Sequence, residues 1–270
     1  MSNIEILSPP KAVSMADEWF EFATTEHFWM QWRHRLLARA LRRSSVQIQC
    51  ALEIGCGHGV ARELLERDFD FPVDGCDLNQ MALEMAKPGK GRLFVYDILD
   101  QAPSLLGRYD AVFLLDVIEH IPDDAAFVIA ASRHLRAGGL LVVNVPANTW
   151  LTSDYDRVAG HLRRYSPWAL KRLFDLCGIE TRGIWQWGLS MIPLLLARKA
   201  LLSPTNTNGA ATIRRGFVPP NRMARLLLQG LKNMETAFPF PMPLGTSILA
   251  WGQLRTSLQE EPSCGLRTFA

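Results

Sequence analysis

The chain has 270 residues, 48% of them hydrophobic, and its 29 Lys and Arg against 27 Asp and Glu give a formal net charge of +2. This composition suits one large α/β domain with additions, and the charge is too mild to indicate a nucleic-acid partner. Five cysteines without paired spacing argue against a disulfide framework or a zinc site and favour a reducing cytoplasm. The sequence contains no run of about 18 uncharged apolar residues, so we expect no membrane span. Residues 1–11 lack the basic-then-apolar build of a signal peptide.

The N-terminal stretch, residues 1–43, is expected to form a helical cap. Residues 1–17 read as a loose leader, and residues 18–43 are predicted to be helical and rich in aromatic side chains. One interpretation is an amphipathic helix packed on the core. A second, compatible interpretation is a lid over a pocket. The residues expected to face that pocket are His27, Trp29 and Arg33.

Three glycines at alternate positions follow an apolar run at residues 50–54, and a helix is predicted to start directly after them. They are Gly55, Gly57 and Gly59. A strand, a glycine turn and a helix form a nucleotide pocket in α/β sheets, because a ligand can lie against backbone that carries no Cβ. Free amide groups at the helix start can hold a polar group. The alternative is an ordinary tight turn.

The surroundings of the glycines decide between cofactor classes. A dinucleotide-binding loop has the pattern Gly-x-Gly-x-x-Gly, whereas residue 60 here is Val. Glu53, two residues before the first glycine, would repel a pyrophosphate but suits a cationic ligand. Both features disfavour a dehydrogenase. Acid-x-Gly-x-Gly-x-Gly resembles motif I of the class I S-adenosylmethionine (SAM) methyltransferases, whose ligand carries an ammonium and a sulfonium.

After the glycine loop, strand and helix patterns alternate, which predicts a parallel, doubly wound sheet. Strands are expected at residues 73–76, 93–96, 110–115 and 140–145, and helices at residues 79–86 and 123–135. With the resemblance, the fold expected is α/β: a Rossmann-like, doubly wound, mostly parallel seven-stranded sheet with a helical N-terminal lid and C-terminal additions. Residues 44–147 would be its SAM-binding core. Ligands in such sheets bind at the carboxyl ends of the strands, where four acids lie. They are Glu53, Asp77, Asp97 and Asp116.

Two of these acids have expected roles at the cofactor. Asp77 lies about 20 residues after the glycine loop, where an acid accepts both ribose hydroxyls. Asp97 suits the adenine amino group, and each acid has an alternative reading as a helix N-cap. The cofactor-binding residues expected are Glu53, Gly55, Cys56, Gly57, Gly59, Asp77, Leu78, Asp97, Ile98 and Leu115.

Further segments narrow the resemblance. Residues 110–124, with Asp116-Val-Ile-Glu119-His120, look like the fourth-strand motif of the type 11 and type 12 small-molecule SAM methyltransferases. Gly160-His161-Leu-Arg-Arg164-Tyr resembles a bacterial subgroup often associated with cell-envelope glycan or secondary-metabolite pathways. The resemblance covers most of the chain but does not bring a substrate with it.

Asp116, Glu119 and His120 stand at i, i+3 and i+4, so a helical turn would place them on one face. That set can hold a divalent metal. The ubiquinone-pathway O-methyltransferases have a similar Glu-x-x-Glu-His, associated there with a magnesium-type ion. In the rival reading, which we favour, no metal is bound, Asp116 caps the turn, Glu119 lines the pocket, and His120 packs or acts as a base.

The connection after the fifth strand commonly forms the acceptor side of this fold. His161 or His120 can remove the proton of a hydroxyl acceptor, because histidine titrates near the working pH. Nearby arginines can clamp a phosphate or carboxylate, or can be surface charges. The catalytic residues expected are His161, His120 and Asp116, and the substrate-binding residues expected are His27, Trp29, Arg33, Asp154, Arg163, Arg164 and Tyr165. Tyr165 has an alternative reading as packing at the helix that Ser166-Pro167 begin.

The C-terminal part, residues 148–258, is expected to supply the substrate side and the end of the sheet. It contains predicted helices at residues 166–177 and 221–236, strands at 179–187 and 246–254, and a mobile loop at 203–216, before a flexible tail at 259–270. The last strand should be antiparallel, as in class I methyltransferases. The apolar residues 188–197 either complete the substrate pocket or rest on a membrane, with Trp185 and Trp187 as interfacial anchors.

The function expected is SAM-dependent methylation of a hydroxyl on a small molecule or glycan, in a natural-product or cell-envelope pathway. The alternatives are N-methylation of a small amine and a SAM-binding protein without transfer activity. The acceptor can also be lipid-linked, with peripheral membrane contact of an otherwise cytoplasmic protein. The oligomeric state is left open.

Overall fold

A computed structural model describes residues 4–11, 20, 22–201, 219, 221–237 and 242–255. The expected mobile loop at residues 203–216 and the tail at residues 259–270 lie outside the described residues, as does most of the leader. Within these ranges, no helix is both long enough and apolar enough to cross a bilayer.

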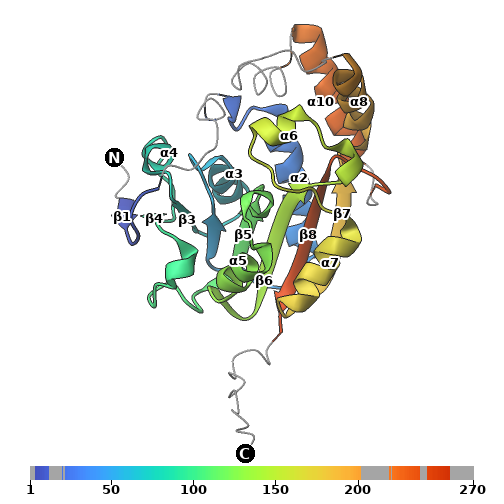
Figure 1. Ribbon diagram of the computed structural model, residues 1–270. Helices are drawn as coiled ribbons and strands as arrows, with labels where there is room; N and C mark the ends of the chain where they lie inside the picture. Colours follow the sequence, from blue (N-terminus) through green and yellow to red (C-terminus); the bar gives the residue numbers. More distant parts are fainter. Residues whose placement is uncertain are drawn as a thin grey trace, which may run out of the picture.

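One mixed sheet organises the described chain, with the strand order β1-β4-β3-β2-β5-β6-β8-β7 (Figure 1). Its strands are β1 (Ile4–Ile6), β2 (Ala51–Ile54), β3 (Val73–Asp77), β4 (Leu93–Val95), β5 (Tyr109–Leu115), β6 (Leu135–Pro146), β7 (Ile179–Trp187) and β8 (Ser247–Leu254). The pairings from β1 to β6 are parallel, whereas β8 runs antiparallel to β6 and β7. The doubly wound fold and the antiparallel last strand are confirmed.

The expected count of seven strands is wrong for the described residues, which form eight. The additional strand is β1, in a segment that we expected to be a loose leader. It pairs with β4 at the sheet edge, and its Ile4 packs against a small apolar cluster that includes Leu83 and Val95. Three residues are too few for a period-2 pattern to be visible in the sequence.

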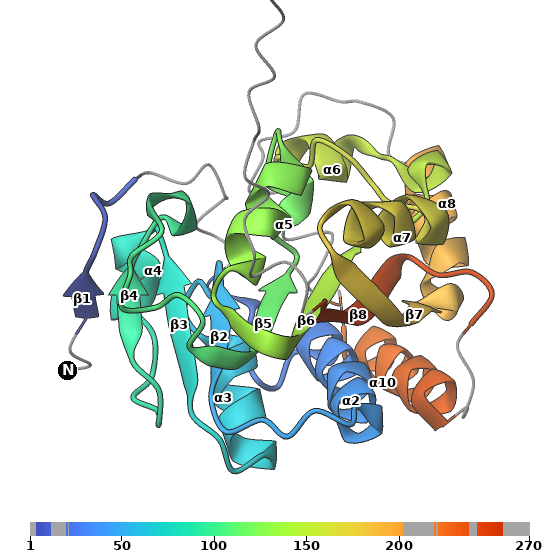
Figure 2. The same ribbon diagram turned by 90° about the horizontal axis from the view of Figure 1, so that it is seen from below.

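Helices cover both faces of the sheet (Figure 2). One face carries α2 (Phe28–Arg43), α3 (Val60–Asp68) and α10 (Arg222–Ala237), and the other carries α5 (Asp124–Ser132) and α7 (Pro167–Leu176). Shorter elements are the helices α4 (Gln80–Glu84), α6 (Asp154–Val158) and α8 (Ile192–Leu201) and the 3₁₀ turns η1 (Ile98–Asp100), η2 (Ile118–His120), η3 (Thr149–Leu151) and η4 (Leu189–Met191).

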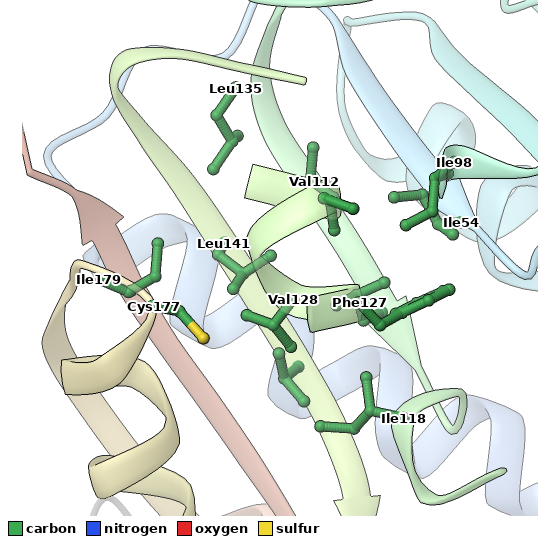
Figure 3. Packing of buried hydrophobic residues seen from close by; sticks show 14 of the residues in the cluster. Ile54, Ile98, Val112, Ile118, Phe127, Val128, Leu135, Leu141, Cys177 and Ile179 are labelled. Atoms are coloured by element: carbon green, nitrogen blue, oxygen red, sulfur yellow. The ribbon is translucent and has the colours of Figure 1, made fainter. Parts of the chain in front are cut away.

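The core lies in two layers, one on each side of the sheet. Along β5, Phe113 belongs to the cluster beneath α2 and α3, whereas its neighbour Val112 belongs to the cluster beneath α5 and α7. This alternation is that of a strand buried on both faces. Figure 3 shows the second layer, in which Val112 lies near Phe127 and Val128 of α5. The two layers fix the strand ends from which the site is built.

Candidate active site

A cavity of about 520 Å³ lies at the carboxyl ends of the parallel strands. Its wall includes the ends of β2, β3 and β5, the segment after β4 and the end of β6. Because β8 is antiparallel, its first residue, Ser247, lies at the same edge and also lines the cavity. This volume is within the usual range for a small-molecule site. The position is the one that an α/β sheet predicts for a ligand.

Backbone without side chains forms the floor of the cavity. Gly55 has φ +70°, and a Cβ there would lie 2.7 Å from Val117 Cγ2. Gly57 has φ +52° and approaches the ring of Phe20. Both positions therefore require glycine. Gly59 has φ +77° and forms the N-cap of α3, and it does not line the cavity.

Asp77 holds the glycine loop in place from the end of β3. Its Oδ2 accepts a hydrogen bond from the Gly57 amide at 2.8 Å, and its Oδ1 accepts one from the Asn79 amide at 2.8 Å. Burial raises the pKa of the Asp77 carboxyl above its usual value, and the hydrogen bonds from these amides only partly oppose this effect. The side chain that caps α4 is that of Asn79, and Asp77 supports this cap by accepting from the Asn79 amide. The Asp77 carboxylate lines the cavity beside bare backbone.

Glu53 is buried, and its Oε2 has no hydrogen-bond partner among the described residues. Burial raises the pKa of Glu53 to about 7, although the positive charges of Arg33 and Arg62 oppose this effect. A buried carboxylate oxygen without a hydrogen-bond partner is costly. A cation in the cavity would supply the missing partner, so the residue fits a positively charged ligand.

The N-terminal segment lies against the far end of the cavity. Lys11 Nζ forms an ion pair of 2.6 Å with Asp97 Oδ2, and the Lys11 amide donates to the Leu78 carbonyl at 3.1 Å. Asp97 also caps η1, because its Oδ1 accepts from the Leu99 amide. Asp97, Leu78 and Ile98 nevertheless line the cavity, so the capping interpretation and a ligand contact are compatible at Asp97.

Asp116 is held by two partners at the end of β5. Its Oδ2 accepts from Arg33 Nη1 at 2.5 Å, and its Oδ1 accepts from Asn144 Nδ2 at 2.6 Å. Asn144 in turn accepts a hydrogen bond from Trp187 Nε1 at 3.0 Å. This network fixes Arg33 of α2 in the cavity wall. The structure thus ties Asp116 to α2 through Arg33 and to β6 through Asn144.

The metal ligands that the sequence analysis considered as an alternative are not the set that the structure brings together. Asp116 has φ +61°, which breaks the helical phase before η2, so the i, i+3, i+4 argument fails for it. The ligand atoms of Glu119, His120 and His161 lie within 4.8 Å of one another instead. Glu119 is fully buried, and neither of its carboxyl oxygens has a partner in the described part of the chain. One oxygen and two nitrogen ligands fit a divalent cation, so these residues are the ones that would hold it.

The two histidines face each other, with ring centroids 4.9 Å apart. His120 Nδ1 donates to the Gly160 carbonyl at 3.2 Å, and His161 Nδ1 donates to Asp156 Oδ1 at 2.9 Å. A carbonyl and a carboxylate can only accept, so both Nδ1 atoms carry the proton and both Nε2 atoms are acceptors when the rings are neutral. Burial, with the charge of His161, lowers the pKa of His120 to about 4.

Asp156 of α6 is a site residue that the sequence analysis missed. It is buried, and besides His161 it accepts from Arg164 Nε at 2.9 Å and forms an ion pair with Arg164 Nη2 at 2.8 Å. Burial acts to raise its pKa, but the His161 hydrogen bond and the Arg164 charge hold that pKa at about 2. The pattern Ser153-x-x-Asp156 forms a capping box, and this signal marks the start of α6.

Four expected substrate residues do not line the cavity. His27 caps α2 and accepts from the Trp29 amide, and Asp154 pairs with Arg157 at 2.8 Å. Arg163 and Tyr165 both bind Asp124, at 2.9 and 2.7 Å, with Tyr165 buried. Arg163 and Tyr165 thus both hold the connection after β6 against Asp124 at the start of α5. The expected catalytic and substrate residues that do line the cavity are Asp116, His120, His161, Trp29, Arg33 and Arg164.

The remaining walls are mostly apolar. Met191 and Leu195, at the start of the apolar 188–197 segment, line the cavity, as expected for a segment that completes a pocket. Other apolar or aromatic lining residues, which the sequence analysis did not single out, are Phe20, Met30, Tyr96, Phe127 and Tyr155.

Comparisons with known proteins agree with this geometry. A family model described as "Methyltransferase domain" matches residues 22–182. The chain is 28% identical over 149 residues to a ubiquinone biosynthesis O-methyltransferase of Thiobacillus denitrificans, covering 52% of this chain and 62% of the relative. It is 30% identical over 151 residues to the same kind of enzyme from Idiomarina loihiensis, covering 48% and 60%. The matched region thus spans less than two thirds of these relatives.

Solved structures share the fold. A SAM-dependent methyltransferase of Archaeoglobus fulgidus has a TM-score of 0.51 at 16% identity, covering 84% of this chain and 97% of that one. A phosphoethanolamine N-methyltransferase of Haemonchus contortus in complex with SAM has a TM-score of 0.56 at 16% identity, covering 83% and 53%. The family match covers more than half of the chain and confirms the resemblance seen in the sequence. The chain belongs to the methyltransferase domain family and has the fold of the class I SAM-dependent methyltransferases.

Proposed function

We propose that this protein transfers the methyl group of SAM to a hydroxyl group of a small molecule or glycan, with His161 as the general base. The observation that carries the proposal is the buried Asp156, which orients His161 so that its Nε2 is the acceptor nitrogen at the cavity. The curated relatives from Thiobacillus and Idiomarina are named as O-methyltransferases, which supports a hydroxyl acceptor.

The cofactor would lie along the glycine loop. Gly55 and Gly57 leave room for it against the backbone, and Asp77 would accept the ribose hydroxyls. The ammonium group of SAM would be a suitable partner for the unpartnered Oε2 of Glu53. Leu78, Ile98 and Asp97 would contact the adenine. When bound, SAM supplies a methyl group on a positively charged sulfur.

The acceptor would bind on the His120 and His161 side. Its oxygen would take the methyl group that SAM supplies, and His161 Nε2 would accept the hydroxyl proton. Asp156 keeps the proton of the neutral ring on Nδ1 and stabilises the imidazolium that forms. Apolar lining from Phe127 and Met191 favours an acceptor with an apolar body. A natural-product or cell-envelope compound meets this description.

Calorimetry tests the cofactor part of the proposal. We expect SAM to bind and NAD not to bind, and Asp77→Ala to abolish SAM binding. Asp154→Ala, which removes an acid outside the cavity lining, is the matched control. Tight binding of NAD without SAM would overturn the assignment, and unchanged affinity in Asp77→Ala would remove Asp77 from the site.

Transfer is tested with methyl-labelled SAM and paired hydroxyl and amine acceptors of the same skeleton. Label on the hydroxyl compounds, lost in His161→Ala with SAM affinity retained, is the expected result. Label on the amine alone would identify an N-methyltransferase. SAM binding without transfer to any acceptor would support a non-catalytic role.

A further inference from the structure

The charge of this chain is unevenly distributed along the sequence. Residues 181–234 contain no Asp or Glu. Their Lys and Arg residues are Arg182, Arg198, Lys199, Arg214, Arg215, Arg222, Arg225 and Lys232. These eight leave 29 − 8 = 21 basic residues against 27 acidic ones elsewhere, so the segment carries +8 and the remainder −6. A net charge of +2 conceals this asymmetry.

The same segment exposes a stripe of large apolar side chains on α10. The exposed fractions are 75% for Met223, 58% for Leu226, 56% for Leu227 and 53% for Met234. Their spacing places them on one side of the helix. The opposite side packs against α2, where Lys232 Nζ donates to Gln31 Oε1 at 2.7 Å. Within the described residues, the stripe thus faces away from the helix that α10 packs on.

Helix α8 extends this surface toward the cavity. Its Leu194 and Leu196 are exposed, and both α8 and α10 contact η4. Leu195, between them, lines the cavity together with Met191 of η4. We define the α8/α10 face by the exposed residues Leu194, Leu196, Met223, Leu226, Leu227 and Met234. Figure 1 shows both helices at the same end of the molecule.

Trp185 and Trp187 cannot serve as the interfacial anchors considered from the sequence. Their exposed fractions are 8% and 1%, because Trp185 packs on Trp251 and Trp187 packs against Trp29 of α2. Any surface contact of this region must therefore use the leucines and methionines of the α8/α10 face.

We propose that the α8/α10 face rests on an anionic lipid bilayer. Exposed apolar side chains beside the exposed Arg222, in a segment without acids, are what a helix lying in a bilayer interface presents. A second copy of the chain that used the same face is a poor occupant, because two segments of +8 would repel each other. A nucleic acid would match the charge but not the leucines. On the bilayer, an apolar acceptor would reach the cavity beside Met191 and Leu195.

Vesicle sedimentation with the full chain tests this proposal without any methyl-transfer assay. We expect binding to vesicles of equal parts phosphatidylcholine and phosphatidylglycerol, weak binding to phosphatidylcholine alone, and weaker binding at high salt. Leu226→Ser with Leu227→Ser should weaken binding by more than about tenfold, because two exposed leucines lose their apolar burial in the bilayer. Arg222→Gln should weaken it by about fivefold.

Leu176→Ser is the matched control, since this leucine of α7 is 67% exposed but lies outside the α8/α10 face. It should bind vesicles as the unmodified chain does. Equal binding to neutral and anionic vesicles, or no effect of the leucine pair, would overturn the proposal. The proposal would also be overturned if the chain failed to bind vesicles and instead formed a dimer that Leu226→Ser with Leu227→Ser abolished. SAM affinity, measured on the same variants, should not change. A failure of the membrane proposal can therefore be distinguished from a failure of the cofactor assignment.

Discussion

Replacing Asp156 by Asn tests the base most sharply. His161 Nδ1 now donates to Asp156 Oδ1 at 2.9 Å, which leaves Nε2 as the acceptor. An amide of the same shape can present its NH₂ group instead, and the ring proton then moves to Nε2. We expect turnover to fall by about two to four orders of magnitude, the usual contribution of a general base, with little change in SAM affinity.

The same change also affects stability, which must be separated from catalysis. The Asp156 and Arg164 side chains are almost fully buried, and their ion pair is 2.8 Å long. Removing one partner of a buried pair costs about 3–5 kcal/mol. Asn keeps the shape of Asp, and Arg164 keeps its hydrogen bond to the Ala147 carbonyl. We therefore expect the destabilisation by Asp156→Asn to lie at the lower end of this range. Asp154→Asn, at an exposed pair, should stay within about 0.5 kcal/mol.

Three measurements distinguish these effects. Thermal melting gives the stability of each variant, and nitrogen NMR of His161 shows which ring nitrogen carries the proton. Labelled methyl transfer gives the rate. If Asp156 acts through His161, the double variant Asp156→Asn, His161→Ala should be no slower than His161→Ala alone. A folded Asp156→Asn with an unchanged rate and an unchanged tautomer would refute the reasoning.

Other variants test other parts of the site. Burial raises the pKa of Glu53 from 4.5 to about 7, so stability should be full below pH 4.5 and fall as the pH rises toward 7. Thermal melts at several pH values should show that Glu53→Gln lacks about 3 kcal/mol of this pH-dependent loss of stability. If the stability of Glu53→Gln depended on pH as that of the unmodified chain does, the burial argument would be contradicted. Arg33→Met should lower the free energy of unfolding by about 2–3 kcal/mol, because it leaves Asp116 without its charge partner. Adding Asp116→Asn to this variant should recover part of the lost stability. If the effects of the two substitutions simply added, the two side chains would not be coupled. A chelator should leave turnover unchanged, whereas a loss restored by a divalent cation would assign Glu119, His120 and His161 to a metal instead.

Local patterns predicted most elements of the fold well. Strand β7 has the bounds expected, and α7 starts after Ser166, whose side chain caps the helix ahead of Pro167. The glycine loop lies at the cavity for the reason expected, since strand, turn and helix are adjacent in sequence. Such features depend on neighbouring residues, and a sequence displays those directly.

Features that depend on tertiary packing were the ones missed. Asp116 was grouped with Glu119 and His120 by helical spacing, but the left-handed backbone at Asp116 and the arrival of Arg33 from α2 separate it from them. Tyr165 was expected at the substrate, yet its hydroxyl binds Asp124 of another helix. Asp156 and Arg164 meet across a turn whose shape no periodicity reveals.

Crystals soaked with SAM or its demethylated product provide the most direct test of the central claim, that this cavity holds a positively charged sulfur nucleotide. We expect the ligand to lie along Gly55 and Gly57, with its ribose at Asp77 and its amino group near Glu53. A cavity that stays empty of both compounds but accepts another nucleotide would contradict the account.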